Sequence, residues 1–185
     1  MNISETQKEV QKSLYKAGIH GEFTHPSKKL SLYGKQGERV ASLVNSGVIR
    51  ERMSMGDAMF LVGNDKNTIA VFHLLARAIV LSGENLRLIS AVELRDIVCF
   101  QKNEQSMATI TQAKVLAIEG FFDSQFQKAF SEPELYAMGW WLTRQINGGV
   151  SVMLQSSHPI GLCGIWSSML RDIIASKSKW QGDTL

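Results

Sequence analysis

The residues with the clearest chemical potential follow the apolar run AMFLV, which ends just before Gly63. A phosphate-binding loop reads G-x-x-x-x-G-K-[ST], with five residues between its first glycine and its lysine. Here only Asn64 and Asp65 separate Gly63 from Lys66, and the second glycine is missing. The pattern is that of a shortened phosphate-binding loop. Its candidate nucleotide-binding residues are Gly63, Lys66, Asn67 and Thr68.

Lys66 lies at the expected start of an apolar helix. A lysine there is unfavourable against the helix dipole unless an anion neutralises it, which favours a phosphate partner. The alternative is a solvated lysine, with Asp65 beside it as the N-cap of the helix. The shortened loop cannot wrap a β-phosphate with successive backbone N–H groups in the usual way. Two possibilities therefore remain open for this site: it binds ATP with Mg²⁺, or it binds no nucleotide.

Glu119 ends the buried run VLAIE. In nucleotide hydrolases an acid at such a strand end holds Mg²⁺, and a following acid polarises the attacking water. Gly120 takes the place of that second acid, and Asp123 lies too far along the chain. The alternatives for Glu119 are a helix cap or an ion pair with Lys66. We assign no catalytic residue and no dedicated metal site, and we do not expect an active ATPase.

The stretch LQSSHPIG supplies a third group of polar residues. Ser157 and His158 would lie near a γ-phosphate, although serine turns before a proline are common. A Ser–His nucleophile is excluded because adjacent residues of a strand point to opposite faces. His73 falls on the apolar face of a helix and is expected to be a core histidine.

Strands and helices alternate from about residue 56 onward. Such alternation with apolar strands is typical of an α/β fold, a parallel sheet covered by helices on both faces. Ligands bind beyond the carboxyl ends of such strands. Gly63, Glu119 and the turn at 156–158 should therefore meet at one edge.

The sequence predicts the following elements. Strands are expected at 58–63, 86–90, 114–122 and 150–157. Helices are expected at 2–18, 33–53, 66–83, 91–101, 131–148 and 162–180, and polar loops at 20–31 and 102–107.

The composition describes an ordinary globular protein. The 185 residues suffice for one domain with a sizeable core. A net charge of +3 permits contact with nucleic acid without requiring it. No stretch approaches the ~20 apolar residues of a membrane span, so a cytoplasmic protein is expected. We divide the chain into an N-terminal helix, 1–17, and a core, 18–185.

From about Lys16 onward the chain resembles the DnaC/IstB-type AAA+ proteins, which are bacterial helicase loaders and their transposition relatives. The segment LYKAGIHGEFTHPSKKLSLYGKQ resembles the one before their P-loop, and AMFLVGNDKNTIAVFHLLARAIVLSGENLRLISAVELRDIV resembles their Walker A strand, helix and following elements. KVLAIEGFF lies where their Walker B strand is found. LTRQINGGVSVMLQSSHPIGL is similar to the stretch reaching their sensor 1, and IWSSMLRDII to the closing helix with its arginine.

The resemblance implies a P-loop, AAA+/RecA-like core of three layers without a separate C-terminal lid. The motifs depart from the family pattern. The loop is short, Glu119-Gly120 replaces paired acids, His158 replaces the sensor asparagine, and Arg171 matches the family's arginine only after a shift of one position. These departures suggest a fold retained for binding while its catalytic equipment decayed.

The resulting hypothesis is a DNA replication adaptor, phage- or prophage-encoded in one interpretation, that loads or regulates a DnaB-type replicative helicase with little or no ATP hydrolysis. Its helix 1–17 would contact the helicase through Val10, Leu14 and Tyr15. Single-stranded DNA and a second copy of the chain are further partners to test. Two alternatives remain: an active ATPase loader using Lys66, Thr68, Glu119 and Arg171, and an IstB-type transposition or DNA-targeting accessory protein.

Overall fold

A four-stranded parallel sheet forms the centre of the molecule in this computed structural model, which describes residues 5–63, 65–101, 104–121 and 129–157. The strand order is β1-β4-β3-β2, so β4 lies between the first and third strands. The predicted α/β class and parallel sheet are therefore confirmed. The strands are β1 (Ala58–Val62), β2 (Leu86–Ser90), β3 (Val115–Glu119) and β4 (Ser151–Ser156).

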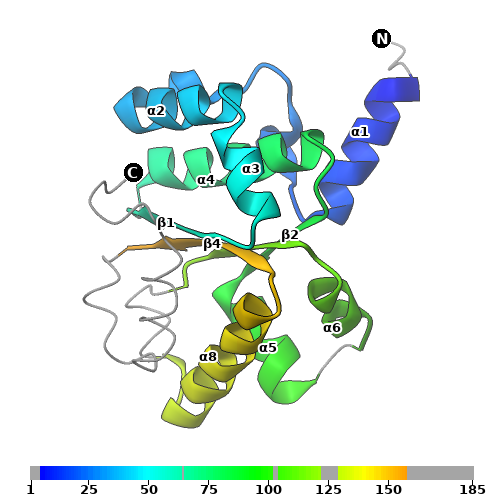
Figure 1. The fold of residues 1–185 in the computed structure, drawn as a ribbon, viewed down its shortest axis with the longest axis vertical. Helices are drawn as coiled ribbons and strands as arrows, with labels where there is room; N and C mark the ends of the chain where they lie inside the picture. The colour runs from blue at the N-terminus through cyan, green and yellow to red at the C-terminus, as the bar shows by residue number, and fades with distance from the viewer. Residues whose placement is uncertain (1–4, 64, 102–103, 122–128, 158–185) are drawn as a thin grey trace.

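Helices cover both faces of this sheet (Figure 1). The connection from β1 to β2 crosses one face, whereas the connections from β2 to β3 and from β3 to β4 return across the other. Right-handed crossovers that run in opposite directions must lie on opposite faces. The upper layer contains α1 (Glu5–Lys16), α2 (Gly34–Asn45), α3 (Val48–Ser54) and α4 (Lys66–Leu81), and the lower layer α5 (Ala91–Phe100), α6 (Glu104–Thr111) and α8 (Glu132–Asn147).

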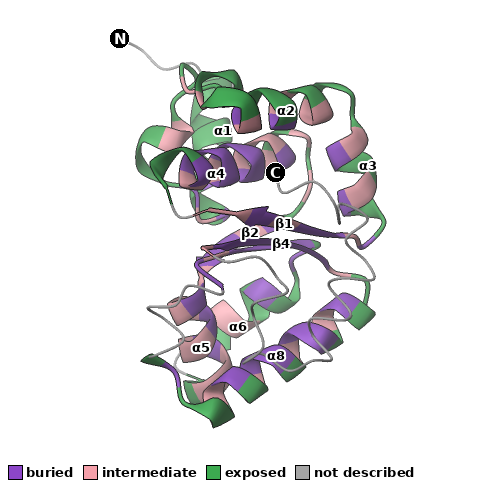
Figure 2. Cartoon of the chain, turned by 90° about the vertical axis from the view of Figure 1, so that its left-hand side faces the viewer, coloured by how far each residue is buried: buried purple, intermediate pink, exposed green. Residues whose placement is uncertain are grey.

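Burial explains why the strands read as continuous apolar runs. The six residues of β4 are all buried, as are Val115 to Ile118 of β3. Two hydrophobic clusters result, one on each face of the sheet, and the buried sides of the helices face it (Figure 2). Leu14, Ala17 and Ile19 belong to the upper cluster, so the end of α1 packs as part of the core.

The free edge of β2 is covered by the segment that follows α1. The Leu88 amide donates to the Ala17 carbonyl at 2.7 Å. Gly18 has a φ of +88°, and a Cβ at this position would collide with the Leu88 carbonyl oxygen. Only glycine meets both requirements without strain. The covered edge cannot pair with another strand at Leu88.

Three predicted elements differ from the structure. The single helix expected at 33–53 is divided into α2 and α3 at Gly47, which has a φ of +77°. The loop expected at 102–107 is wrong from Glu104 on, because α6 begins there and buries Ile110. The loop at 20–31 contains two short 3₁₀ turns, η1 (Gly21–Thr24) and η2 (Leu30–Leu32). The helix expected at 162–180 lies outside the described residues.

Candidate functional site

The carboxyl ends of three strands meet as the sequence predicted. The Gly63 amide donates to the Ser156 carbonyl at 2.7 Å, which continues the pairing of β1 with β4. Gln155, buried inside β4, connects both neighbours: its Oε1 accepts from the Gly120 amide at 2.8 Å, and its Nε2 donates to the Gly63 carbonyl. The role of Gln155 was not predicted, although a glutamine in an otherwise apolar strand was a usable signal.

Asp65 occupies the N-terminus of α4 with its own carboxylate. Its Oδ1 accepts from the amides of Asn67 at 2.8 Å and of Thr68 at 3.1 Å. These hydrogen bonds stabilise the charged form, and together with the Thr68 hydroxyl they lower the pKa of Asp65. The N-cap alternative for Asp65 is therefore confirmed. Free amides bind phosphate at other helix N-termini, whereas here the amides of Asn67 and Thr68 already donate to a carboxylate of the chain.

Thr68 is turned toward Asp65 as well. It is buried, and its hydroxyl lies 2.6 Å from Oδ2 of Asp65 and 3.2 Å from Oε1 of Gln36. Gly63 packs directly against this threonine, since a Cβ at Gly63, where φ is +142°, would meet Thr68 Oγ1. A threonine at this place in a phosphate-binding loop gives its hydroxyl to Mg²⁺. Here the hydroxyl is used inside the protein.

Lys66 and Asn67 are both exposed at the first turn of α4. Lys66 makes no ion pair with any described residue, so a pair with Glu119, one of the alternatives for that acid, is not found. The Asp65 carboxylate beside Lys66 offsets the unfavourable interaction of this lysine with the helix dipole.

Glu119 instead pairs with His73 of α4. Nε2 of His73 and Oε2 of Glu119 lie 3.0 Å apart, and the histidine side chain is 13% exposed. The ring of Phe23 stacks on His73 with 4.5 Å between the centroids, and Nδ1 of His73 is buried without a partner among the described residues. The expectation of a core histidine was incomplete. His73 is enclosed as predicted, but it also takes the carboxylate that a metal ion would need.

Arg77, one turn further along α4, fixes the segment that carries Phe23. Its Nη1 donates to the carbonyls of Phe23 at 3.1 Å and His25 at 2.8 Å. Burial lowers the pKa of this guanidinium below its ordinary value, though it remains charged. The η1 segment is thus held against α4 beside the Glu119–His73 pair. Sequence reasoning missed this arrangement, because its members are more than 50 residues apart.

The other predicted nucleotide-binding and partner-binding residues do not all lie at this edge. Ser157 lies at the predicted edge, and its Oγ is buried with no hydrogen-bond partner in the described part of the chain. His158 and Arg171 lie outside the described residues. Leu14 is 1% exposed and belongs to the core, so it is not available to a partner, whereas Val10 and Tyr15 are exposed at 37% and 52%.

Within the described ranges, no group of three or more His, Cys, Asp or Glu side chains is arranged to hold a metal ion. A magnesium ion at this edge would have to displace His73 from Glu119 and Asp65 from Thr68. The residues present therefore fit an internally satisfied site better than a metal site.

No described helix is both long and apolar enough to span a membrane.

No protein-family model and no curated protein matches this sequence. Solved structures do share its fold. DnaI is similar with a TM-score of 0.60 and 10% identity over 83% of this chain and 86% of that one. The DnaC helicase loader is similar with a TM-score of 0.55 and 13% identity over 82% and 92%. AMPPCP-bound DnaA from Aquifex aeolicus is similar with a TM-score of 0.60 and 12% identity over 82% and 49%.

The chain shares its fold with the structures of DnaI, the DnaC helicase loader and DnaA, in agreement with the fold that the sequence resemblance implied. The chain spans about half the length of the replication initiators that it matches, and most of the length of DnaI and the DnaC loader. At identities of 10 to 13%, these similarities show a shared fold and nothing more. The activity and the partners of this protein have to be argued from its own residues.

Proposed function

We propose that this protein is a DNA replication adaptor that binds a DnaB-type replicative helicase and loads or regulates it in the cytoplasm without relying on its own ATP hydrolysis. The fold supports this proposal, because helicase loaders are among the structures that share it. The mechanism would be a shift of the helicase ring between closed and open forms. Such a shift requires that the adaptor bind one form more tightly than the other.

The Asp65 carboxylate is the single observation that carries the nucleotide-independent part. It already accepts the hydrogen bonds of the Asn67 and Thr68 amides and of the Thr68 hydroxyl. A phosphate entering this site would have to displace one negative charge and replace three hydrogen bonds. Since charge-assisted hydrogen bonds are worth about 1.5–3 kcal/mol each, that exchange strongly weakens nucleotide binding.

The Glu119–His73 contact supports the same conclusion from the neighbouring strand. A metal ion bound by Glu119 would compete with an imidazole at 3.0 Å that is itself stacked on Phe23. Gly120 follows where a second acid would be needed, and its amide is engaged by Gln155. At this edge the carboxylates of Asp65 and Glu119 therefore both have side-chain partners, and no second acid follows Glu119.

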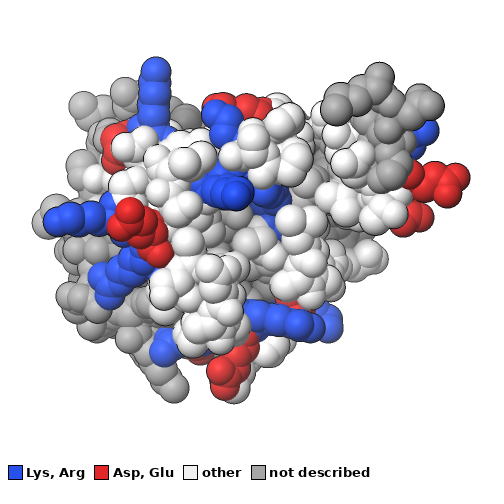
Figure 3. Space-filling model, turned by 90° about the horizontal axis from the view of Figure 1, so that it is seen from above, with Lys and Arg blue, Asp and Glu red and all other residues white. Residues whose placement is uncertain are grey.

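The exposed side of α1 is the proposed contact with the helicase. The helix is anchored by Leu14, while Val10 and Tyr15 offer apolar surface to a groove of the partner. Lys8, Lys12 and Lys16 are exposed along the same helix. Lys and Arg side chains are scattered over the upper face and do not form one continuous patch (Figure 3). This distribution favours a protein partner over duplex DNA. Duplex DNA is the partner expected under the alternative of an IstB-type accessory protein.

Size-exclusion chromatography with light scattering tests the proposal. The protein is mixed with the host replicative helicase without nucleotide and then with ATP, and the Lys66→Ala variant is the matched control. We expect a complex in both conditions and with both proteins. A complex that forms only with ATP and is lost in Lys66→Ala would favour the active ATPase alternative. No complex in either condition would refute the helicase assignment. The protein alone reports its self-association.

A further inference from the structure

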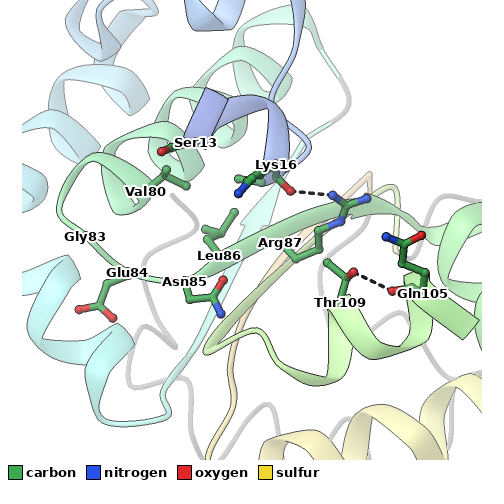
Figure 4. A pocket seen from close by; sticks show the side chains of 11 residues that line it. Ser13, Lys16, Val80, Gly83, Glu84, Asn85, Leu86, Arg87, Gln105 and Thr109 are labelled. Atoms are coloured by element: carbon green, nitrogen blue, oxygen red, sulfur yellow. Dashed lines mark hydrogen bonds between the residues drawn. The ribbon is translucent and has the colours of Figure 1, made fainter. Parts of the chain in front are cut away.

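A cleft of about 670 Å³ lies at the amino-terminal edge of the sheet, where β2 begins. Its walls come from the end of α1, the turn between α4 and β2, and α6 (Figure 4). Gly63 and Glu119 lie at the other, carboxyl-terminal ends of the strands. The cleft and the candidate nucleotide site are therefore separate.

Two cations share one side of the cleft. Nη1 of Arg87 donates to the Lys16 carbonyl at 2.7 Å (Figure 4). Nη2 of Arg87 lies 3.5 Å from Oε1 of Glu93. These contacts fix the guanidinium, while its Nε is buried with no acceptor among the described residues. The Lys16 ammonium is exposed and forms no ion pair in the described part of the chain.

The charges in the cleft do not cancel. Glu84 is the one acid among the described residues that line it, and it lies 4.0 Å from the guanidinium of Arg50. Glu93 partly balances Arg87, whereas Lys16 has no counter-charge among the described residues. The floor beside these cations is apolar, because Ala17 and Leu86 are buried core residues whose surfaces line the cleft. A matching ligand carries both negative charge and an apolar group.

We propose that this cleft binds an acidic peptide segment of the partner protein, with carboxylates at Lys16 and Arg87 and an apolar side chain over Ala17 and Leu86. Guanidinium and ammonium groups form charge-assisted hydrogen bonds with carboxylates. A nucleic acid is a poorer match, since phosphates spread along a backbone require a row of cations on an open surface. This proposal rests on the proposed function, because it makes the cleft part of the helicase contact beside α1.

Two matched pairs of variants test the cleft in the full chain. Lys16→Glu at the end of α1 and Lys35→Glu in α2 make the same charge change at exposed positions, but only Lys16 lines the cleft, and Lys35 lies outside α1. Gln105→Glu in α6 and Gln112→Glu directly after this helix make a second such pair, in which only Gln105 lines the cleft. We expect the two cleft variants to weaken helicase binding about tenfold, and the two controls to stay within about twofold of the wild type.

Helicase titrations separate the two proposals. If the wild type binds the helicase and each cleft variant behaves like its control, the cleft proposal is overturned while the proposed function stands. If the wild type does not bind, the proposed function fails, and the cleft is tested directly. The direct test is an NMR titration with a short peptide of alternating glutamate and leucine, with a lysine–leucine peptide as control.

In that titration we expect amide shifts at Lys16, Arg87 and Thr109 with the acidic peptide only, which Lys16→Glu abolishes. Absence of such shifts, or equal shifts with the basic peptide, would overturn the proposal. The same titration with a thymidine oligonucleotide tests whether the cleft binds nucleic acid instead. Stronger shifts of the same amides with the oligonucleotide would reassign the cleft to nucleic acid and refute the peptide proposal.

Discussion

The Asp65 carboxylate receives both polar hydrogens of Thr68, the hydroxyl at 2.6 Å and the amide at 3.1 Å. This one relationship turns a potential anion site into an N-cap. The helix dipole of α4 and its first amides are satisfied by the chain itself. Lys66 is then left in solvent with no described partner.

Asp65→Ala should lower the free energy of unfolding by about 1 kcal/mol, as expected when a helix loses its N-cap side chain. Asp65→Asn keeps a side-chain oxygen acceptor and should cost less. Urea unfolding followed by circular dichroism measures both variants. Equal stability of the wild type and Asp65→Ala would contradict the capping role.

The stabilisation by Asp65 should depend on pH. The folded pKa lies below the ordinary value of 3.8, so the contribution is complete above that value and is lost as the pH falls through the lowered pKa. The difference in unfolding free energy between the wild type and Asp65→Asn should therefore be constant near neutral pH and shrink in acid. The pKa of Glu134 is also lowered, by its hydrogen bonds with Ser131, so Glu134 makes stability depend on pH in the same way. This contribution is the same in the wild type and in Asp65→Asn, so it cancels in the difference. A difference that grows in acid would have the wrong sign.

His73 and Glu119 should be energetically coupled. A double-mutant cycle with His73→Ala and Glu119→Ala should give a coupling of roughly 0.5–1.5 kcal/mol, the usual net worth of a hydrogen bond at a partly buried site. Glu119→Gln should keep most of the stability, since its amide oxygen can still accept from Nε2. Additive effects of the two substitutions would mean that the 3.0 Å contact does not contribute.

Gly18→Ala should be among the more damaging small substitutions in the chain. It adds a Cβ that collides with the Leu88 carbonyl and must also adopt a φ of +88°. Gly21→Ala is the control, with a φ of +61° and no atom within 4 Å of its added Cβ. The control should cost about 1 kcal/mol from the left-handed backbone alone, and Gly18→Ala clearly more. Similar thermal midpoints for the two would refute the proposed close approach to β2.

The strands and most helices were predictable from sequence because each has a continuous apolar run or a helical apolar stripe. The cap at Ser90 also follows from its place before the helix, and its Oγ accepts from the Glu93 amide at 3.1 Å. The α6 helix was missed because its few apolar residues, Met107 and Ile110, give too weak a period in eight residues.

The contacts of the candidate site were harder to predict. The edge itself followed from parallel topology, and the Asp65 cap from local sequence. The partner of Glu119 could not be predicted, because His73 is 46 residues away and its place depends on how α4 packs over the sheet. The same holds for Arg77 and Phe23, which meet only when η1 folds back on α4.

The most direct test of the central claim is the dissociation constant for the replicative helicase, measured by fluorescence anisotropy with and without saturating ATP, for the wild type and Lys66→Ala. The adaptor account predicts that ATP changes the affinity of either protein less than about twofold, because the Asp65 carboxylate already accepts the hydrogen bonds of the Asn67 and Thr68 amides at the start of α4. Binding at least tenfold tighter with ATP in the wild type, and not in Lys66→Ala, would contradict it.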